Sequence, residues 1–139
     1  MNTTAYASNP RTDRIIGNVL TWIAALFQLL DGGMKLFKPQ VVVDATLALG
    51  FPASSIVGMG IVLIMGTIAY LVPRTALFGA IFVTAYLGGA VAAHVRVKDP
   101  LFSHVLFPVY LAAVLWAGLA LRDPRLRRLL FDPSNDAVS

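Results

Sequence analysis

The chain has 139 residues, enough for one domain; 58% are hydrophobic, 13% are charged, and the mean hydropathy is +0.76. Soluble domains carry about 25% charged residues because water must wet their surface, so this composition excludes an ordinary soluble domain. The basic residues behind the net charge of +4 lie between and beyond the apolar stretches. This placement predicts that the partner is a lipid bilayer and that nucleic acid is not a partner. The lack of cysteine excludes disulfides, thiolate nucleophiles and iron–sulfur ligation.

Four apolar stretches predict an all-α bundle of four transmembrane helices, at about residues 15–35, 54–72, 75–95 and 101–121. Each is close to 20 residues long, and at 1.5 Å per residue such a helix crosses about 30 Å of hydrocarbon. We therefore assign residues 14–122 to the transmembrane domain. Residues 1–13 are predicted to form a polar N-terminal tail, and residues 123–139 a basic, flexible C-terminal tail.

The connection between the first two spans contains a further apolar stretch, residues 39–49. Pro39 suits the first position of a helix, and Gly50 suits the position just after its end. This pattern predicts a short interfacial or re-entrant helix that lies over one end of the bundle.

The basic residues divide unequally between the two sides of this topology. One side holds seven arginines, namely Arg11, Arg14, Arg74, Arg122, Arg125, Arg127 and Arg128. The other side holds four basic residues, namely Lys35, Lys38, Arg96 and Lys98. Because cytoplasmic loops are enriched in Lys and Arg, the count predicts that both termini are cytoplasmic.

A polar stripe runs along the first span at helical steps of three and four. Its members are Asn18, Thr21, Ala25, Gln28, Gly32 and Lys35, with Asp31 alongside. A polar face in a bilayer turns toward protein, so the stripe is predicted to face the interior. For Asn18 and Thr21 we favour hydrogen bonds to neighbouring helices; for Gln28, Asp31 and Lys35, contact with a ligand is an equal alternative.

The third span places Tyr86, Ala90 and His94 on one helix face. Small residues four apart, including Gly88 and Gly89 with Ala92 and Ala93, together with Gly58 and Gly66 of the second span, predict close helix packing. The alternative for these glycines is that they make room for a ligand.

Pro108 in the fourth span removes the hydrogen bond to the carbonyl of His104, four residues earlier, which predicts a kink there. Asp31, Lys35, His94, Arg96 and His104 then lie at similar depth near the non-cytoplasmic end, beneath the short helix. This arrangement predicts a pocket, with a salt-bridged layer that only fixes helix register as the alternative. The predicted ligand-binding residues are Gln28, Asp31, Lys35, Tyr86, His94, Arg96, His104, Phe107 and Tyr110.

Asp31, His94 and His104 resemble a two-histidine, one-carboxylate metal set only in composition. The two histidines are ten residues apart across a loop, with no pair at i and i+4 on one helix. Both also lie at one end of adjacent helices, which disfavours a bis-histidine haem. We therefore expect no metal and no haem.

Five short sequences, in this order and spacing, resemble the DoxX-like group of the DoxX superfamily. They are Gly-Gly-Met-Lys-Leu at 32–36, Leu-Gly-Phe-Pro at 49–52, Pro-Arg-Thr at 73–75, Tyr-Leu-Gly-Gly-Ala-Val-Ala-Ala-His at 86–94 and His-Val-Leu-Phe-Pro at 104–108. The similarity covers about residues 14–121. It implies a small four-helix protein of the bacterial inner membrane, in a superfamily with a link to quinone oxidoreduction.

The leading hypothesis from the sequence is an accessory membrane protein that binds a small amphipathic ligand, a quinone or a lipid, in the predicted pocket. A second hypothesis is an enzyme, either a quinone-linked oxidoreductase subunit or a membrane isomerase, with His94 or His104 as general acid or base. A third is an assembly or interaction subunit of a larger membrane complex, and a homo-oligomer also remains open.

Overall fold

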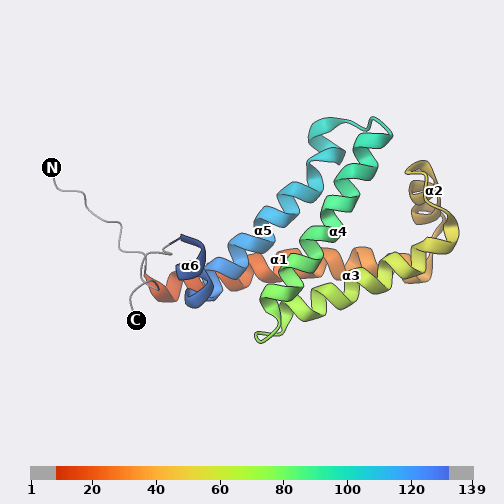
Figure 1. Ribbon diagram of the computed structural model, residues 1–139. Coiled ribbons are helices and arrows are strands. Elements are labelled where there is room, and N and C mark those ends of the chain that lie inside the picture. Colours follow the sequence, from red (N-terminus) through yellow and green to blue (C-terminus); the bar gives the residue numbers. More distant parts are fainter. Residues whose placement is uncertain (1–8, 132–139) are drawn as a thin grey trace.

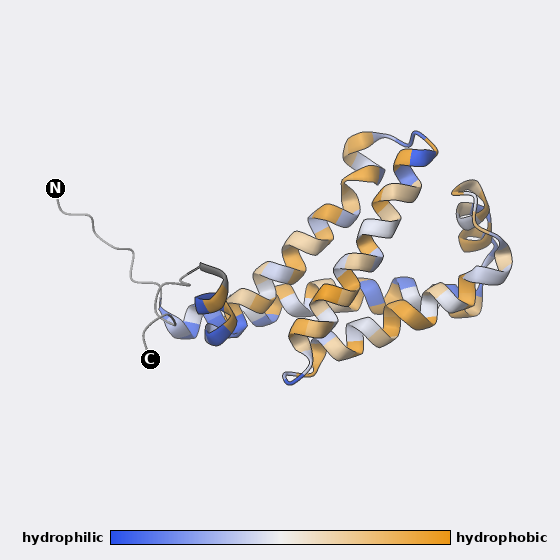
Figure 2. Ribbon diagram, viewed as in Figure 1, coloured by the Kyte–Doolittle hydropathy of each residue, from blue (hydrophilic) through white to orange (hydrophobic). Residues whose placement is uncertain are grey.

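A computed structural model describes residues 9–131, and within that range the chain is built from helices joined by short turns (Figure 1). Four helical segments are long and apolar enough to cross a membrane, which confirms the predicted four-helix membrane bundle. They are α1 (Pro10–Phe37), α3 (Ile56–Leu71) with the 3-10 turn Ala53–Ser55 before it, α4 (Ala76–Arg96), and the segment Leu101–Arg122, which ends in α5 (Phe107–Arg122). Hydrophilic residues gather at the turns and on the last helix (Figure 2).

The first span begins earlier than its apolar stretch. The Asn9 side chain accepts a hydrogen bond of 3.1 Å from the backbone N–H of Arg11, and Pro10 occupies the first helical turn. Both are standard helix-start features, because they satisfy or remove backbone donors that lack partners within the helix. The helix ends at Lys38, whose φ of 51° is left-handed.

The short helix predicted between the first two spans is confirmed as α2 (Gln40–Ala48). Pro39 precedes the helix rather than occupying its first position, and Gly50 follows it with a φ of 78°. The segment is thus bounded by two left-handed residues, Lys38 and Gly50. Within the fold α2 packs mainly on the turn before α3, at the end of the bundle opposite α6 (Figure 1).

The fourth span is interrupted at the position that Pro108 predicts. A π-helical turn covers Leu101–Val105, and α5 starts at Phe107 with Pro108 in its first turn. Because proline has no N–H to donate to the carbonyl of His104, one regular helix cannot continue through this point. The predicted kink is therefore observed as a break at Leu106.

The residues after α5 form another helix, α6 (Pro124–Phe131). Asp123 caps it by accepting hydrogen bonds from the backbone N–H groups of Arg125 at 2.9 Å and Leu126 at 3.4 Å. Leu126 is buried, and Arg127 forms an ion pair of 2.9 Å with Asp13 of α1. Residues 124–131 of the predicted tail are thus helical and packed on the bundle, whereas residues 1–8 and 132–139 lie outside the described residues.

Glycines bring the helices closest together at the α6 end of the bundle. A Cβ atom at Gly79 of α4 would lie 2.1 Å from the backbone nitrogen of Tyr70 in α3. A Cβ atom at Gly17 of α1 would lie 2.6 Å from the backbone nitrogen of Arg122, and one at Gly118 of α5 would lie 2.8 Å from that of Thr21. These three positions are therefore glycine because backbone meets backbone there.

At the other end, only α1 and α3 remain in such close contact. A Cβ atom at Gly60 would lie 2.7 Å from the carbonyl oxygen of Gly32. By contrast, a Cβ atom at Gly58, Gly88 or Gly89 would meet nothing within 4 Å. The prediction of close packing is therefore wrong for those three glycines, although Gly66 does pack against Phe82. In agreement with this open space, the α4–α5 hairpin leans away from α1 and α3 at this end (Figure 1).

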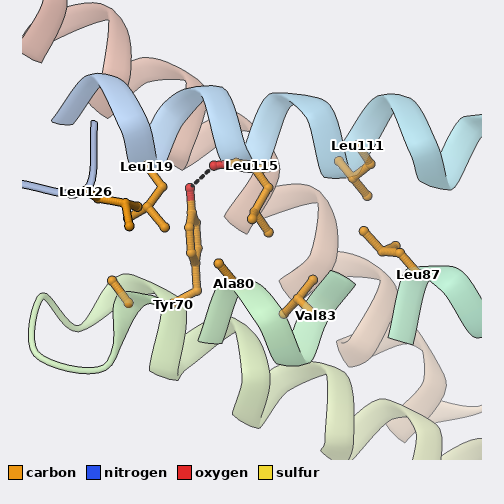
Figure 3. Packing of buried hydrophobic residues seen from close by; sticks show 10 residues of the cluster. Tyr70, Ala80, Val83, Leu87, Leu111, Leu115, Leu119 and Leu126 are labelled. Atoms are coloured by element: carbon orange, nitrogen blue, oxygen red, sulfur yellow. Dashed lines mark hydrogen bonds between the residues drawn. The ribbon is translucent and has the colours of Figure 1, made fainter. Parts of the chain in front are cut away.

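The buried core lies mainly between α3, α4 and α5, near the α6 end, with Ala24 of α1 also in the cluster. Leu115, Leu119, Ala80 and Val83 surround Tyr70, which is fully buried (Figure 3). The Tyr70 hydroxyl donates to the carbonyl oxygen of Leu115 at 2.9 Å and lies 3.2 Å from Thr21 Oγ1. This bond satisfies the hydroxyl inside an apolar cluster, as a buried tyrosine requires.

Replacing Tyr70 with phenylalanine removes this hydroxyl and leaves the ring in place. We expect a loss of about 1 kcal/mol in the free energy of unfolding, the usual net value of one such hydrogen bond. Thermal melting of the two purified proteins in detergent measures the difference. The exposed Tyr110 provides the control, because Tyr110→Phe is expected to leave the melting temperature unchanged. Equal melting temperatures for wild type and Tyr70→Phe would contradict the predicted role of the bond.

Candidate functional site: a cleft at the open end of the bundle

The divergence of the α4–α5 hairpin leaves a cleft of about 640 Å³, here called the open-end cleft. Its volume lies within the usual range for small-molecule sites, and its walls are mainly apolar. One side is formed by α1, α2 and the start of α3, and the other by α4 and the start of α5. The residues that line it are Phe27, Gln28, Asp31, Met34, Lys35, Val41, Val42, Ala45, Thr46, Leu49, Phe51, Met59, Leu63, Ala85, Tyr86, Leu87, Gly89, Ala90, Ala93, His94, Phe107, Pro108 and Leu111.

Six of the residues predicted from the sequence line this cleft, and three do not. Those that line it are Gln28, Asp31, Lys35, Tyr86, His94 and Phe107. Arg96 and His104 lie near its mouth, as described below, and Tyr110 is exposed on α5 away from the lining. A new helix begins after the break before Pro108, so His104 and Tyr110 do not share one continuous helical face. Their positions relative to the cleft therefore do not follow from sequence spacing.

Residues of α2 and of the turn after it also belong to the cleft, although none was predicted as a site residue from the sequence. Val41, Val42 and Thr46 of α2, with Leu49 and Phe51 beyond it, form one wall of the cleft. The available signal was the apolar character of residues 39–49, from which only a covering helix was inferred. Its contribution of side chains to the cleft depends on the turn that folds α2 back over the space between the spans.

Gln28 lies at the deep end of the polar stripe, and its side chain is only 1% exposed. Its Oε1 atom is 3.3 Å from Thr67 Oγ1 of α3, whereas its Nε2 atom has no hydrogen-bond partner among residues 9–131. An unpaired polar group that is buried costs about 1–3 kcal/mol, so native proteins rarely retain one without a reason. Here a donor belongs to the lining of an apolar cleft, and no atom of the described residues accepts its hydrogens.

Lys35 and Asp31 lie closer to the mouth of the cleft. The Lys35 ammonium donates to Asp31 Oδ1 at 2.5 Å, one helical turn away on α1. Lys35 is largely buried and Asp31 is partly exposed. Because the two charges offset each other, the polar wall of the cleft is close to neutral while it still offers both donors and acceptors.

His94 and His104 do come together, as their similar depth predicted. Their ring centroids are 5.9 Å apart, in an edge-to-face arrangement. Asp99, which the sequence analysis did not single out, lies 2.6 Å from His94 Nδ1, and Ser103 Oγ lies 2.8 Å from His104 Nδ1. A carboxylate on Nδ1 orients the imidazole and leaves its Nε2 atom for other partners. Within residues 9–131, no cluster of three potential metal-ligating side chains is found.

Arg96 connects the two sides of the cleft at its mouth. Its guanidinium donates to the carbonyl oxygen of Leu49 and lies 5.5 Å from the centre of the Phe51 ring. It also packs so closely on Gly50 that a Cβ atom there would collide with it. In this arrangement Arg96 tethers the end of α4 to the segment between α2 and α3 rather than lining the cleft.

Replacing Arg96 with glutamine is expected to loosen α2. A cation–π contact is worth about 0.5–1 kcal/mol at an exposed site, and the bond to Leu49 is lost as well, so local opening should become roughly fivefold more frequent. Hydrogen exchange of residues 40–50, measured by mass spectrometry, reports that opening. Arg14→Gln, at the opposite end of α1, is the charge-matched control and should leave exchange unchanged. Unaltered exchange in Arg96→Gln would show that the tether does not hold α2.

These features define a multi-pass membrane protein whose four spans close tightly at one end and enclose an apolar cleft at the other. The chain belongs to the DoxX-like family, whose sequence pattern it matches over residues 19–118. This confirms the resemblance identified from the sequence, and the match extends from α1 to α5, including every residue that lines the open-end cleft. Neither a curated protein nor a solved structure matched in the corresponding comparisons.

Proposed function

We propose that this protein binds a small amphipathic ligand, a quinone or a lipid, in the open-end cleft and acts as an accessory protein of the bacterial inner membrane. The observation that carries the proposal is the buried Gln28 Nε2 atom, a donor without a partner in the described part of the chain, at the deep end of an apolar cleft. In the proposed orientation both termini face the cytoplasm, because the arginine-rich end of the bundle then lies inside. The cleft accordingly opens near the outer surface of the membrane.

The distribution of polar groups supports an amphipathic ligand. Gln28 lies about 10 Å below Lys35 along α1, given the rise of 1.5 Å per residue. A hydrogen-bond acceptor on the ligand, such as a carbonyl or ester oxygen, would satisfy the Gln28 amide, while Lys35 and Asp31 remain available to a second polar group nearer the mouth. The apolar walls of the cleft, which include Phe27 and Met59, would hold the hydrocarbon portion of the ligand.

Proton transfer to or from the ligand is a second candidate function, favoured by the contact between Asp99 and His94. Asp99 would stabilise the imidazolium that forms when His94 Nε2 accepts a proton from the ligand. His94→Gln and Asp99→Asn are then expected to retain the ligand and to fail to complement a deletion strain. Full complementation by both variants would overturn proton transfer and leave ligand binding as the only proposed function.

The experiment that tests binding compares two adjacent glycines of α4. Gly89 lines the cleft and Gly88 does not, and neither would bring a Cβ atom within 4 Å of a neighbour. Gly89→Leu therefore fills the cleft without a backbone clash, and Gly88→Leu adds the same side chain outside it. Both variants and the wild type are purified in mild detergent, and the molecules that co-purify are extracted and identified by mass spectrometry.

We expect one class of molecule, quinone or lipid, to co-purify in near-stoichiometric amount with the wild type and with Gly88→Leu, and to be lost from Gly89→Leu. The mass identifies which class occupies the cleft. Equal amounts in all three proteins would assign the molecule to the detergent-exposed surface and overturn the proposal. A wild-type protein with no bound molecule above background would also overturn it.

A further inference from the structure

We propose that a groove at the opposite, arginine-rich end of the bundle binds the headgroup of an anionic phospholipid. The groove has a volume of about 240 Å³ and lies between the turn that joins α3 to α4 and helix α6. Its lining residues are Pro73, Arg74, Ala76, Leu77, Phe78, Leu119, Asp123, Arg125, Leu126 and Leu129. It lies at the other end of the bundle from the open-end cleft, so the proposal stands independently of the proposed function.

The charges of the groove favour an anion. Arg74 and Arg125 are exposed, and within residues 9–131 neither guanidinium forms an ion pair or donates a hydrogen bond. The one acidic residue of the lining, Asp123, already accepts hydrogen bonds from two backbone N–H groups of α6. Guanidinium groups bind phosphate oxygens through paired hydrogen bonds, so two of them at one groove suit a phosphate headgroup.

Two nearby arginines, Arg122 and Arg127, have partners within the fold. Arg122 donates to the carbonyl oxygen of Tyr70 at 2.6 Å and lies 4.8 Å from the centre of its ring. Arg127 is paired with Asp13. The fold therefore uses Arg122 and Arg127 to hold the helix ends together, whereas Arg74 and Arg125 are the exposed arginines that line this groove.

The apolar surroundings of the groove indicate a lipid rather than a free anion. Phe78 of α4 and Leu129 of α6 border the two arginines and are 72% and 61% exposed. Leu126 is buried in the core cluster and fixes α6 on the bundle, which holds the exposed Arg125 beside the turn that carries Arg74. A phosphate held between the arginines would thus have its acyl chains beside the exposed first turn of α4.

The test measures binding of single lipids to the purified full-length chain by native mass spectrometry in detergent. The probes are phosphatidylglycerol, phosphatidylcholine and inorganic phosphate. The test variant is Arg74→Gln with Arg125→Gln. The control is Arg11→Gln with Arg14→Gln, which removes the same charge from exposed residues at the same end of the bundle. Melting temperatures verify that all proteins are folded.

Phosphatidylglycerol is expected to bind the wild type and the control equally and the test variant roughly tenfold or more weakly, because each basic residue contributes severalfold near an anionic headgroup. Phosphatidylcholine should bind all three proteins alike, and millimolar inorganic phosphate should not displace phosphatidylglycerol. An equal loss in both double variants, or no loss in either, would overturn the site. Displacement by inorganic phosphate would overturn the assignment to a lipid.

Discussion

Replacing Gly79 with alanine is expected to destabilise the bundle by about 2–3 kcal/mol, the largest effect of a single methyl group in this chain. The new Cβ atom would lie 2.1 Å from the backbone nitrogen of Tyr70 and 2.5 Å from its Cα atom. Backbone atoms cannot rotate away as a side chain can, so α3 and α4 must separate. Overpacking typically costs 1–3 kcal/mol and occasionally more, and a contact this short with backbone atoms should cost about 3–4 kcal/mol. The better helix propensity of alanine offsets about 1 kcal/mol of that strain.

Separation of α3 from α4 would also disturb the core, because Tyr70 lies in the contact. The measurement is thermal melting in detergent followed by tryptophan fluorescence, with Gly88→Ala as the matched control. Gly88 is an exposed glycine of the same helix with free space around its Cβ position, so alanine there should leave the melting temperature unchanged or raise it slightly. Similar behaviour of the two variants would show that α3 and α4 do not meet through Gly79.

Replacing Gln28 with methionine is expected to change stability and ligand binding in opposite directions. Methionine has nearly the same shape, but it removes a buried Nε2 donor for which the described residues offer no acceptor. Relief of that unpaired group is worth about 1–3 kcal/mol, and only the long bond to Thr67 is lost, so the empty protein should become about 1 kcal/mol more stable. The ligand loses its deepest hydrogen bond and should bind roughly tenfold more weakly.

The control for this substitution is the other glutamine of the chain, Gln40, which is exposed and donates to Asp44 at 2.8 Å. Gln40→Met should change both quantities little, because solvent replaces that bond. Melting temperatures of delipidated protein give the stability, and titration with the co-purifying molecule gives the affinity. If Gln28→Met were instead less stable than wild type, the amide would have to be satisfied within the protein, and the main support for a ligand would be lost.

Much of the fold could be predicted because the controlling features are local. Each span is an apolar stretch of membrane-crossing length, and Pro108 cannot continue the helix before it, so the helices and the break follow directly. The polar stripe also placed Gln28, Asp31 and Lys35 on one inward face, since their spacing follows the helical repeat.

The rest depends on how the helices diverge, which spacing cannot reveal. Gly79 and Gly88 look alike in sequence, yet one meets a neighbouring backbone and the other meets nothing. Arg96 was predicted to bind a ligand because of its depth, but its long side chain reaches the segment after α2 instead. Asp99 lies in a connecting loop, and only the fold of that loop brings it to His94.

The ion pair between Asp13 and Arg127 has a practical consequence for labelling. It joins the beginning of α1 to α6, so α1 begins and α6 lies at the same end of the bundle, opposite α2 (Figure 1). A fluorescent reporter attached ahead of α1 and another attached after α6 should therefore emerge together, and neither should obstruct the open-end cleft. The same pair of reporters, each able to fold only in the cytoplasm, would also reveal which way the bundle is inserted.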